Sequence, residues 1–315
     1  MKKILITGIS SFIGYHLAKY FSGLSYEVTG TVSKKLREYE QRSIQAKRLN
    51  NLKEVNIFKL DMRDNQSLKN TIQDVKPDYC IHHAGYTQNY GSFEYDIDQA
   101  FEINVRPLYA LYKELTDVGC KGVIITGTNA EYSDCDLANM ENDNCMPTTP
   151  YGLSKLNETL SAYQLSKFFN LPTRISRVYI PFGAMDSPNK LFPYLINLLK
   201  QNRTVDLSPG LQKRDFIYIK ELVRIYFSLL LDLETGNFEI FNACSGAPIR
   251  LKDFICLICE KLGKETKLLD FNARQMRPRE PRISYGNTNK LSTMLNYQFN
   301  YSLENAIEDY LNEEK

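Results

Sequence analysis

The chain has 315 residues, which at ~150 residues per domain predicts about two domains, or one large α/β domain with an added lobe. Its 39 Lys and Arg residues nearly balance its 37 Asp and Glu residues, and this balance is not typical of a nucleic-acid-binding protein, which carries a basic stripe. Only three histidines are present, so we expect neither a histidine-based hydrolytic triad nor a metal site.

The cysteines and the apolar runs bear on the cellular compartment. The seven cysteines are scattered, and the closest pair, Cys256 and Cys259, lies among apolar residues typical of a buried helix, so we expect reduced, buried thiols. The N-terminal apolar run ends at Gly8, too early for a signal sequence, and no run approaches the ~18 apolar residues of a membrane span. We therefore expect a cytoplasmic protein without a membrane or nucleic-acid partner.

Short apolar runs alternate with helical patterns through the first half of the chain. The expected strands are residues 2–8, 26–32, 55–61, 78–85, 122–128 and 172–179. The expected helices are residues 12–23, 67–75, 100–119 and 153–169. Because strands that alternate with helices form βαβ units with right-handed crossovers, the pattern predicts an α/β fold with a doubly wound (Rossmann) parallel sheet.

The pattern changes after about residue 178. Residues 180–190 are rich in Pro, Gly and polar residues and predict a loop, and a helix is expected over 191–201. A strand is expected at 239–246 and a further helix after Pro248. We expect a dinucleotide-binding domain over 1–178, to which 211–246 returns, and a smaller, mostly α C-terminal substrate lobe over 179–315.

The junction between the first strand and the first helix carries a spaced-glycine pattern. Gly8, Ser11 and Gly14 follow the strand directly and open the helix. In this position a tight turn brings backbone N–H groups and the helix N-terminus against a diphosphate. The pattern predicts a dinucleotide site, and an ordinary glycine-rich turn is the alternative.

The end of the second strand bears on the choice of dinucleotide. An acidic residue there would bind the adenosine ribose hydroxyls and select NAD. Ser33, Lys34 and Lys35 stand there instead, and they could hold a 2′-phosphate by hydrogen bonding and charge. NADP(H) is therefore favoured over NAD(H), with a solvated basic loop as the alternative.

Tyr151 and Lys155 form the most informative local pattern. Residues at i and i+4 lie on one face of a helix, so the lysine ammonium is expected near the phenol. A nearby positive charge stabilises phenolate and lowers the tyrosine pKa from ~10 toward the working pH. Tyr151 is then a candidate general acid or base for the interconversion of a carbonyl and an alcohol.

These motifs together resemble the extended short-chain dehydrogenase/reductases, in particular the NAD-dependent epimerase/dehydratase family. The resemblance rests on TGISSFIG at 7–14, TGTNAEY at 126–132 and PYGLSK at 150–155, and it covers roughly residues 2 to 312. The chain departs from the family at Ser11, where the middle glycine of the turn is usual. Several segments, among them KPDYCIHHAG and FNACSGAPIRLKDF, resemble the reductases of GDP-4-dehydro-6-deoxy-D-mannose and related nucleotide-sugar 4-ketoreductases.

The resemblance implies roles for individual residues. The implied catalytic residues are Thr128, Tyr151 and Lys155, with Asn104 supporting the lysine through its backbone and a water molecule. The implied cofactor-binding residues are Gly8, Ser11, Phe12, Ile13, Gly14, Ser33, Lys34, Lys35, Asp61, Met62, His83, Ala84, Gly85, Asn104, Tyr151 and Lys155. The implied substrate-binding residues are Thr128, Asn129, Arg214 and Arg277, with the two arginines on the diphosphate of a nucleotide sugar.

The residues after Thr128 narrow the expected reaction. Dehydratases of this family carry acidic residues there, whereas this chain has Asn129 and Ala130. We therefore expect an NAD(P)-dependent oxidoreductase of deoxysugar or polysaccharide biosynthesis that reduces the C4 keto group of a nucleotide-4-keto-6-deoxysugar. A 4-epimerase or 4-dehydrogenase would use the same three residues, and a non-catalytic dinucleotide-binding sensor is the second alternative. The resemblance also implies a homodimer.

Overall fold

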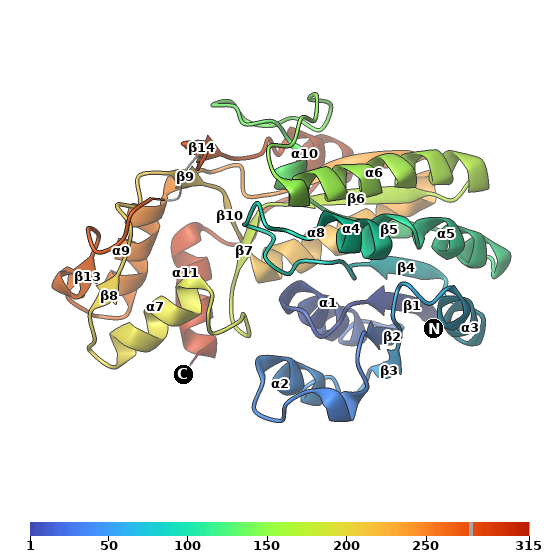
Figure 1. Ribbon diagram of the computed structural model, residues 1–315, viewed down its shortest axis with the longest axis horizontal. Helices are drawn as coiled ribbons and strands as arrows, with labels where there is room; N and C mark the ends of the chain where they lie inside the picture. The colour runs from blue at the N-terminus through green and yellow to red at the C-terminus, as the bar shows by residue number, and fades with distance from the viewer. Residues whose placement is uncertain (277–279, 315) are drawn as a thin grey trace.

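The computed structural model describes residues 1–276 and 280–314, and it is built around one seven-stranded sheet (Figure 1). The strands are β1 (Lys2–Thr7), β2 (Tyr26–Val32), β3 (Asn56–Lys59), β4 (Tyr79–His82), β5 (Val123–Thr128), β6 (Thr173–Val178) and β11 (Phe238–Ala243). Their order in the sheet is β11-β6-β5-β4-β1-β2-β3, and every neighbouring pair is parallel. The order runs outward in both directions from the first strand, so the predicted doubly wound sheet is confirmed.

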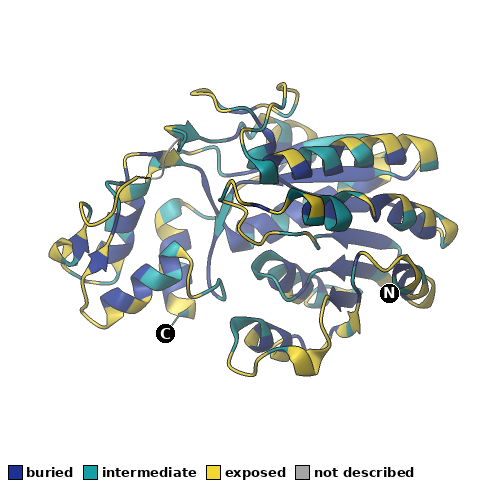
Figure 2. Ribbon diagram, in the orientation of Figure 1, coloured by how far each residue is buried: buried dark blue, intermediate teal, exposed yellow. Residues whose placement is uncertain are grey.

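Helices cover both faces of the sheet. They are α1 (Phe12–Ser22), α3 (Asn65–Val75), α4 (Ile97–Ala100), α5 (Leu108–Asp117), α6 (Pro150–Phe169) and α8 (Ile219–Asp232). Helices α1 and α8 pack together, and α5 packs against both α3 and α6. Successive residues of a strand point to opposite faces, so Ile4 and Ile6 join one apolar core while Leu5 joins the other. The central strands are accordingly buried along their length (Figure 2).

A smaller lobe lies beside the sheet and contains short strands as well as helices (Figure 1). Its helices are α7 (Leu191–Lys200), α9 (Leu251–Lys261) and α11 (Leu303–Glu313), whereas α10 (Asn289–Leu295) packs against β11 and α8 at the edge of the large sheet. Its short strands are β7 (Ile180–Phe182), β8 (Val205–Asp206), β9 (Lys213–Arg214), β10 (Phe216–Tyr218), β12 (Ile249–Arg250), β13 (Leu269–Asp270) and β14 (Ile283–Ser284). Phe254 of α9 centres its aromatic core, with its ring 4.4 Å from that of Phe216 and 4.6 Å from that of Phe192.

Several elements differ from the sequence-based prediction. The expected loop over 180–190 begins with β7, which pairs with β10 in parallel. Helix α2 (Ile44–Asn50) lies between β2 and β3, where no helix was predicted. The expected helix over 100–119 is divided by a π-helical turn, Phe101–Val105, which precedes Pro107. Proline has no N–H to continue the helical ladder, and this explains the break.

Two expectations concern thiols and membranes. Cys259 is buried on α9 and Cys256 is half-buried, and neither is in a disulfide. Within residues 1–276 and 280–314, we find no helix of the length and hydropathy needed to cross a bilayer.

The start of α6 packs very closely against the end of β5. Thr149 caps the helix by accepting a hydrogen bond from the Gly152 N–H at 3.0 Å, and Pro150 occupies the first helical position. A Cβ atom at Gly152 would lie 2.1 Å from the carbonyl oxygen of Ala130, in the short 3-10 helix Asn129–Glu131 that follows β5. Glycine therefore permits a backbone-to-backbone approach that no other residue allows.

We predict that Gly152→Ala destabilises the protein although alanine is the better helix former. Alanine gains about 1 kcal/mol in helix propensity, whereas forced overpacking costs about 1–3 kcal/mol. Because the added Cβ atom would lie 2.1 Å from a backbone oxygen, we expect an overpacking cost near the upper end of that range. We expect the free energy of unfolding to fall by about 1–2 kcal/mol in urea denaturation. Gln164→Ala, at an exposed position on the same helix, should change it by no more than about 0.5 kcal/mol. A Gly152→Ala protein as stable as the wild type would contradict the close contact.

Candidate active site

The glycine-containing turn after β1 is seated on the end of β4. Gly8 has φ of +77°, a conformation that glycine adopts readily, and a Cβ atom there would lie 2.9 Å from the Cα of Ala84. The N–H groups of Gly8 and Ile9 both donate to the Thr31 carbonyl at 3.0 Å. The turn is thus fixed between β2 and β4, and it aims the N-terminus of α1 at the carboxyl edge of the sheet.

Ser11, where the family has glycine, is the N-cap of α1. Its hydroxyl oxygen accepts a hydrogen bond from the Gly14 N–H at 3.0 Å and lies 2.8 Å from His83 Nε2. The first-turn N–H groups of Phe12 and Ile13 have no carbonyl within the helix to bond. These donors and the helix dipole form a site that suits an anionic group such as a diphosphate. The turn therefore fits a dinucleotide.

His83 links this turn to β5. Its Nδ1 lies 3.0 Å from the Thr126 hydroxyl, which in turn lies 2.7 Å from the Tyr226 hydroxyl. Burial lowers the pKa of His83 to about 3, so the imidazole is neutral near pH 7. Serine at position 11 thus belongs to a hydrogen-bonded chain that crosses the sheet edge.

The expected adenosine end of the site is more exposed. Ser33, Lys34 and Lys35 follow β2 and are all exposed, and the Lys35 N–H donates to the Glu38 carboxylate at 3.0 Å. The strand-end pattern that favours NADP(H) does not include Glu38. A 3-10 helix over Leu36–Glu38 brings its carboxylate close to the end of β2.

Two further predicted residues lie at the end of β3. Asp61 is ion-paired with Arg63 at 2.6 Å, and hydrogen bonding to Arg63 lowers the pKa of Asp61. Met62 is buried. The end of β3 therefore presents a fixed carboxylate beside an apolar residue.

Arg48 is a residue that sequence reasoning missed. Its side chain is buried, and it donates to the Ser10 carbonyl at 2.9 Å and to the Met185 carbonyl at 2.7 Å. It thus joins the turn before α1 to the lobe. No local motif marks it, because its partners lie 38 and 137 residues away in the chain.

Thr128 and Tyr151 come together at the junction of β5 and α6. Thr128 is the last residue of β5, and Tyr151 lies in the first turn of α6. Burial raises the pKa of Tyr151 well above its usual value and the Glu158 charge adds to this, whereas a hydrogen bond with Thr128 acts in the opposite direction. The tyrosine is therefore a protonated phenol, ready to act as an acid.

Lys155 differs from its expected arrangement. It lies on α6 four residues after Tyr151, but its ammonium forms an ion pair with the buried Glu158 carboxylate. The expectation that the lysine lowers the tyrosine pKa therefore does not describe this structure. The reason is that the positive charge near the phenol is matched by a carboxylate that the motif does not include.

Asn104 lies in the π-helical turn and is fully buried. Its Oδ1 accepts a hydrogen bond from the Tyr86 N–H at 2.8 Å, and its Nδ2 lies 3.4 Å from the Ser154 hydroxyl. A Cβ atom on Gly85 would lie 3.3 Å from the same Oδ1. Asn104 thus joins the segment after β4 to α6 at Ser154, the residue that precedes Lys155.

Two aromatic residues beside Tyr151 are also absent from the predicted site. The rings of Tyr90 and Tyr95 lie 5.5 and 5.8 Å from that of Tyr151. Tyr90 accepts a hydrogen bond from Lys190 at 2.8 Å, which connects this wall to the lobe. Both tyrosines come from the irregular segment before α4, where no periodic pattern points to them.

The predicted substrate residues lie on adjoining segments. The Asn129 amide donates to the Ser284 hydroxyl at 3.1 Å, and Ser284 of β14 pairs with Arg214 of β9. Arg214 is held by Glu280 at 3.0 Å, and burial lowers its pKa. Arg277, the other predicted substrate residue, lies outside the described residues.

Glu131, two residues after Asn129, is fully buried and committed to structural contacts. One carboxylate oxygen accepts from the Thr128 N–H at 2.9 Å, and the other accepts from Thr159 and from Arg177, both at 2.9 Å. Its ion pair with Arg177 is buried on both sides. This carboxylate is therefore unavailable for acid or base chemistry at the sheet edge.

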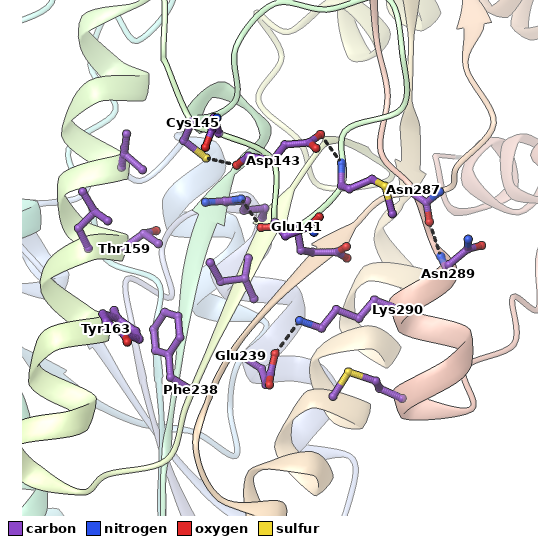
Figure 3. Close-up of a pocket in the computed structure, with 18 of the residues that line it drawn as sticks. Glu141, Asp143, Cys145, Thr159, Tyr163, Phe238, Glu239, Asn287, Asn289 and Lys290 are labelled. Carbon is purple, nitrogen blue, oxygen red and sulfur yellow. Dashed lines mark hydrogen bonds and ion pairs between the residues drawn. The ribbon is translucent and has the colours of Figure 1, made fainter.

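A separate cavity lies on the outer side of α6 (Figure 3). Its volume is about 810 Å³, and it is bounded by the segment 140–145, α6, β11 and α10. Lys290 and Glu239 form an ion pair of 2.6 Å across its wall. Among the described residues that line it are neither Thr128 nor Tyr151 nor Lys155, so it is distinct from the candidate active site.

Comparisons with known proteins identify relatives of this chain. A dTDP-D-glucose 4,6-dehydratase of Dictyostelium discoideum is 30% identical over 268 residues, which are 77% of this chain and 60% of that protein. A dTDP-4-dehydro-6-deoxyglucose reductase of Escherichia coli is 30% identical over 175 residues, 54% of this chain and 55% of that protein. The chain thus spans less than two thirds of the length of these two curated relatives.

A solved structure and a family model extend the match over most of the chain. The UDP-glucuronic acid 4-epimerase of Bacillus cereus, in complex with UDP-glucuronic acid and NAD, superposes with a TM-score of 0.85 at 23% identity, covering 98% of each chain. The family model matches residues 4–244, from β1 to the end of β11. The chain belongs to the NAD dependent epimerase/dehydratase family.

Proposed function

We propose that this protein is an NAD(P)-dependent nucleotide-sugar oxidoreductase that reduces the C4 keto group of a nucleotide-4-keto-6-deoxysugar. The observation that carries the proposal is the pairing of a half-buried, protonated Tyr151 with Thr128 at the carboxyl edge of the sheet. Family membership alone leaves ketoreduction, epimerisation and dehydration open. The residues around Thr128 argue against dehydration.

The chemistry assigned to the chain is proton donation and alignment. A reduced nicotinamide, when bound, supplies a hydride for carbon C4. Tyr151 gives its proton to the C4 oxygen, so one hydride and one proton convert the carbonyl into an alcohol. Thr128 donates a hydrogen bond to the same oxygen, and Lys155 binds the ribose and then neutralises the Tyr151 phenolate that remains.

Dehydration is disfavoured by the residues that follow Thr128. Removal of the C5 proton and of the C6 hydroxyl requires an acid and a base near the sugar. Asn129 and Ala130 cannot titrate, and the next carboxylate, Glu131, is held by Thr159 and Arg177. A 4-epimerase needs no such acid and base pair and passes through the same ketone, so it is the alternative function.

The proposed cofactor contacts follow the geometry of the sheet edge. The diphosphate would lie on the α1 N-terminus at Phe12 and Ile13 and the ribose on Lys155. Exposed Lys34 and Lys35 would meet a 2′-phosphate, which favours NADP(H) over NAD(H).

The proposed sugar-nucleotide contacts involve the lobe. Arg214 suits the diphosphate because its guanidinium donates two parallel hydrogen bonds. It would exchange its present partner, Glu280, for the substrate. Arg277 remains a prediction for the same role.

We also propose a homodimer. Helices α5 and α6 expose large apolar side chains that are unusual on a free surface, namely Tyr109, Leu160, Tyr163 and Phe168, which are 50–66% exposed. Sedimentation at several concentrations tests this, and a monomer at every concentration would refute it.

We predict that the protein oxidises NADPH in the presence of a nucleotide-4-keto-6-deoxysugar. A panel of GDP-, dTDP-, CDP- and UDP-linked sugars would be followed by the loss of nicotinamide absorbance. Tyr151→Phe should lower kcat by about 10²–10⁴-fold, because the proton donor is lost while the fold remains.

The control is Tyr163→Phe, on the same helix but lining the outer cavity. It should retain the wild-type rate. Turnover that is equal in wild type and Tyr151→Phe would refute the reductase. Nicotinamide that copurifies with the protein, together with interconversion of C4 epimers, would favour an epimerase.

We predict that replacing both Lys34 and Lys35 by alanine weakens the binding of NADPH about tenfold or more and that of NADH little, because only NADPH carries the 2′-phosphate. Titration of each reduced cofactor by fluorescence measures this. Lys47→Ala, exposed on the neighbouring α2, serves as the control. Tighter binding of NADH by the wild type would contradict the role of the two lysines.

A further inference from the structure

The inner side of α6 carries a buried carboxylate that the proposed mechanism does not use. Glu158 has a side chain only 1% exposed, and it lies one turn beyond Lys155, whose side chain is 8% exposed. The two form an ion pair on the face of the helix that packs on the sheet. A carboxylate buried so deeply is costly unless its charge is matched, so the pair constrains the position of the lysine.

A histidine faces the same carboxylate, and its tautomer follows from its hydrogen bonds. The Thr7 hydroxyl oxygen accepts hydrogen bonds from the backbone N–H groups of His83 and Ala84, both at 2.9 Å, so both of its lone pairs are used. Its own hydrogen is therefore donated to His82 Nδ1, at 3.0 Å. Burial lowers the pKa of His82 to about 3, so the ring is neutral and its single hydrogen is on Nε2.

That Nε2–H group points at Glu158 without bonding to it. The atom is buried, has no hydrogen-bond partner among the described residues, and lies 3.9 Å from the Glu158 carboxylate. This distance is too long for a hydrogen bond, but a small movement of the carboxylate would close it. Glu158 therefore has a second, vacant partner available on β4 if the lysine leaves.

We propose that Glu158 is a positioning residue for Lys155, which it holds on the inner side of α6 until the ribose of a dinucleotide and the Tyr151 phenol compete for the ammonium. The His82 Nε2–H group then donates a hydrogen bond to the released carboxyl group. The proposal rests on the function proposed above, because it assigns Lys155 to the cofactor and to Tyr151. It adds a residue that the Tyr-x-x-x-Lys pattern does not contain.

The groups around Glu158 decide how it responds to protons. Lys155 and Tyr151 face it from α6, His82 from β4, Glu131 from the 3-10 helix after β5, and Tyr112 from α5. The Glu131 charge is matched by Arg177.

Burial raises the pKa of Glu158 to about 7, while Lys155 acts in the opposite direction. If the ammonium leaves, the pKa of the carboxyl rises further, so the carboxylate takes up a proton.

The first test measures Tyr151 without any sugar substrate. The absorbance of tyrosinate is recorded against pH for each protein and for its Tyr151→Phe derivative, and the difference reports Tyr151 alone. In Glu158→Gln the ammonium is free to face the phenol and the carboxylate that opposed ionisation is gone. The pKa of Tyr151 should then fall by about one to three pH units relative to the wild type.

Two variants serve as references in this titration. Glu158→Asp keeps the charge and should stay close to the wild type, and Asn157→Ala, the neighbouring residue on α6, should not differ from it. A merely structural ion pair predicts that Glu158→Gln loses stability but titrates as the wild type does. That result would overturn the proposal.

The second test uses the wild type, so it does not depend on whether a variant folds. Dinucleotide binding is measured by calorimetry in buffers of different ionisation enthalpy, which gives the number of protons taken up. We expect about one proton at about pH 8 and nearly none at about pH 5.5, where Glu158 is already protonated. Equal proton uptake at both pH values would also overturn the proposal.

These readouts separate the two claims. A shifted Tyr151 titration without turnover of any sugar would leave Glu158 as a positioning residue and remove the ketoreductase. Turnover of a sugar together with an unshifted Tyr151 titration would support the ketoreductase and remove the positioning role of Glu158.

Discussion

The architecture of the site depends on how closely α6 approaches the end of β5. The contact between Gly152 and the Ala130 carbonyl brings the first turn of the helix against the residues that follow Thr128. Tyr151 is thereby held beside Thr128, and Lys155 and Glu158 are turned toward the sheet. A helix that stood farther away, as any side chain at residue 152 would require, would separate the phenol from the hydroxyl and expose the buried ion pair to water.

The polar groups beneath that helix form a connected arrangement rather than isolated contacts. Thr7, at the end of β1, orients His82, whose ring faces the carboxylate paired with Lys155. On the other side of β4, His83 connects Ser11 with Thr126. The three histidines of the chain, His16 included, are all neutral because burial lowers their pKa values to about 3 or 4. They therefore act here as hydrogen-bonding groups, and the proposed proton donor is a tyrosine.

Much of the fold could be predicted from the sequence, because local patterns determine the order of strands and helices. The alternation of strands and helices gave the doubly wound sheet, and the position of Gly8 and Gly14 gave the turn before α1. What local patterns could not give are partners far apart in the chain, such as Arg48 with Met185 or Tyr90 with Lys190. The state of Lys155 was missed for a different reason. Spacing places it near Tyr151, but only the packed structure shows that Glu158 already matches its charge.

The central claim is that a hydride reaches C4 of a keto-sugar while Tyr151 protonates its oxygen. The most direct test supplies NADPH deuterated at the transferred position, together with a nucleotide-4-keto-6-deoxysugar that is turned over, and locates the deuterium in the product by NMR. The account predicts one deuterium on C4 of the alcohol and none elsewhere. A product without deuterium at C4, or with deuterium at another carbon, would contradict it.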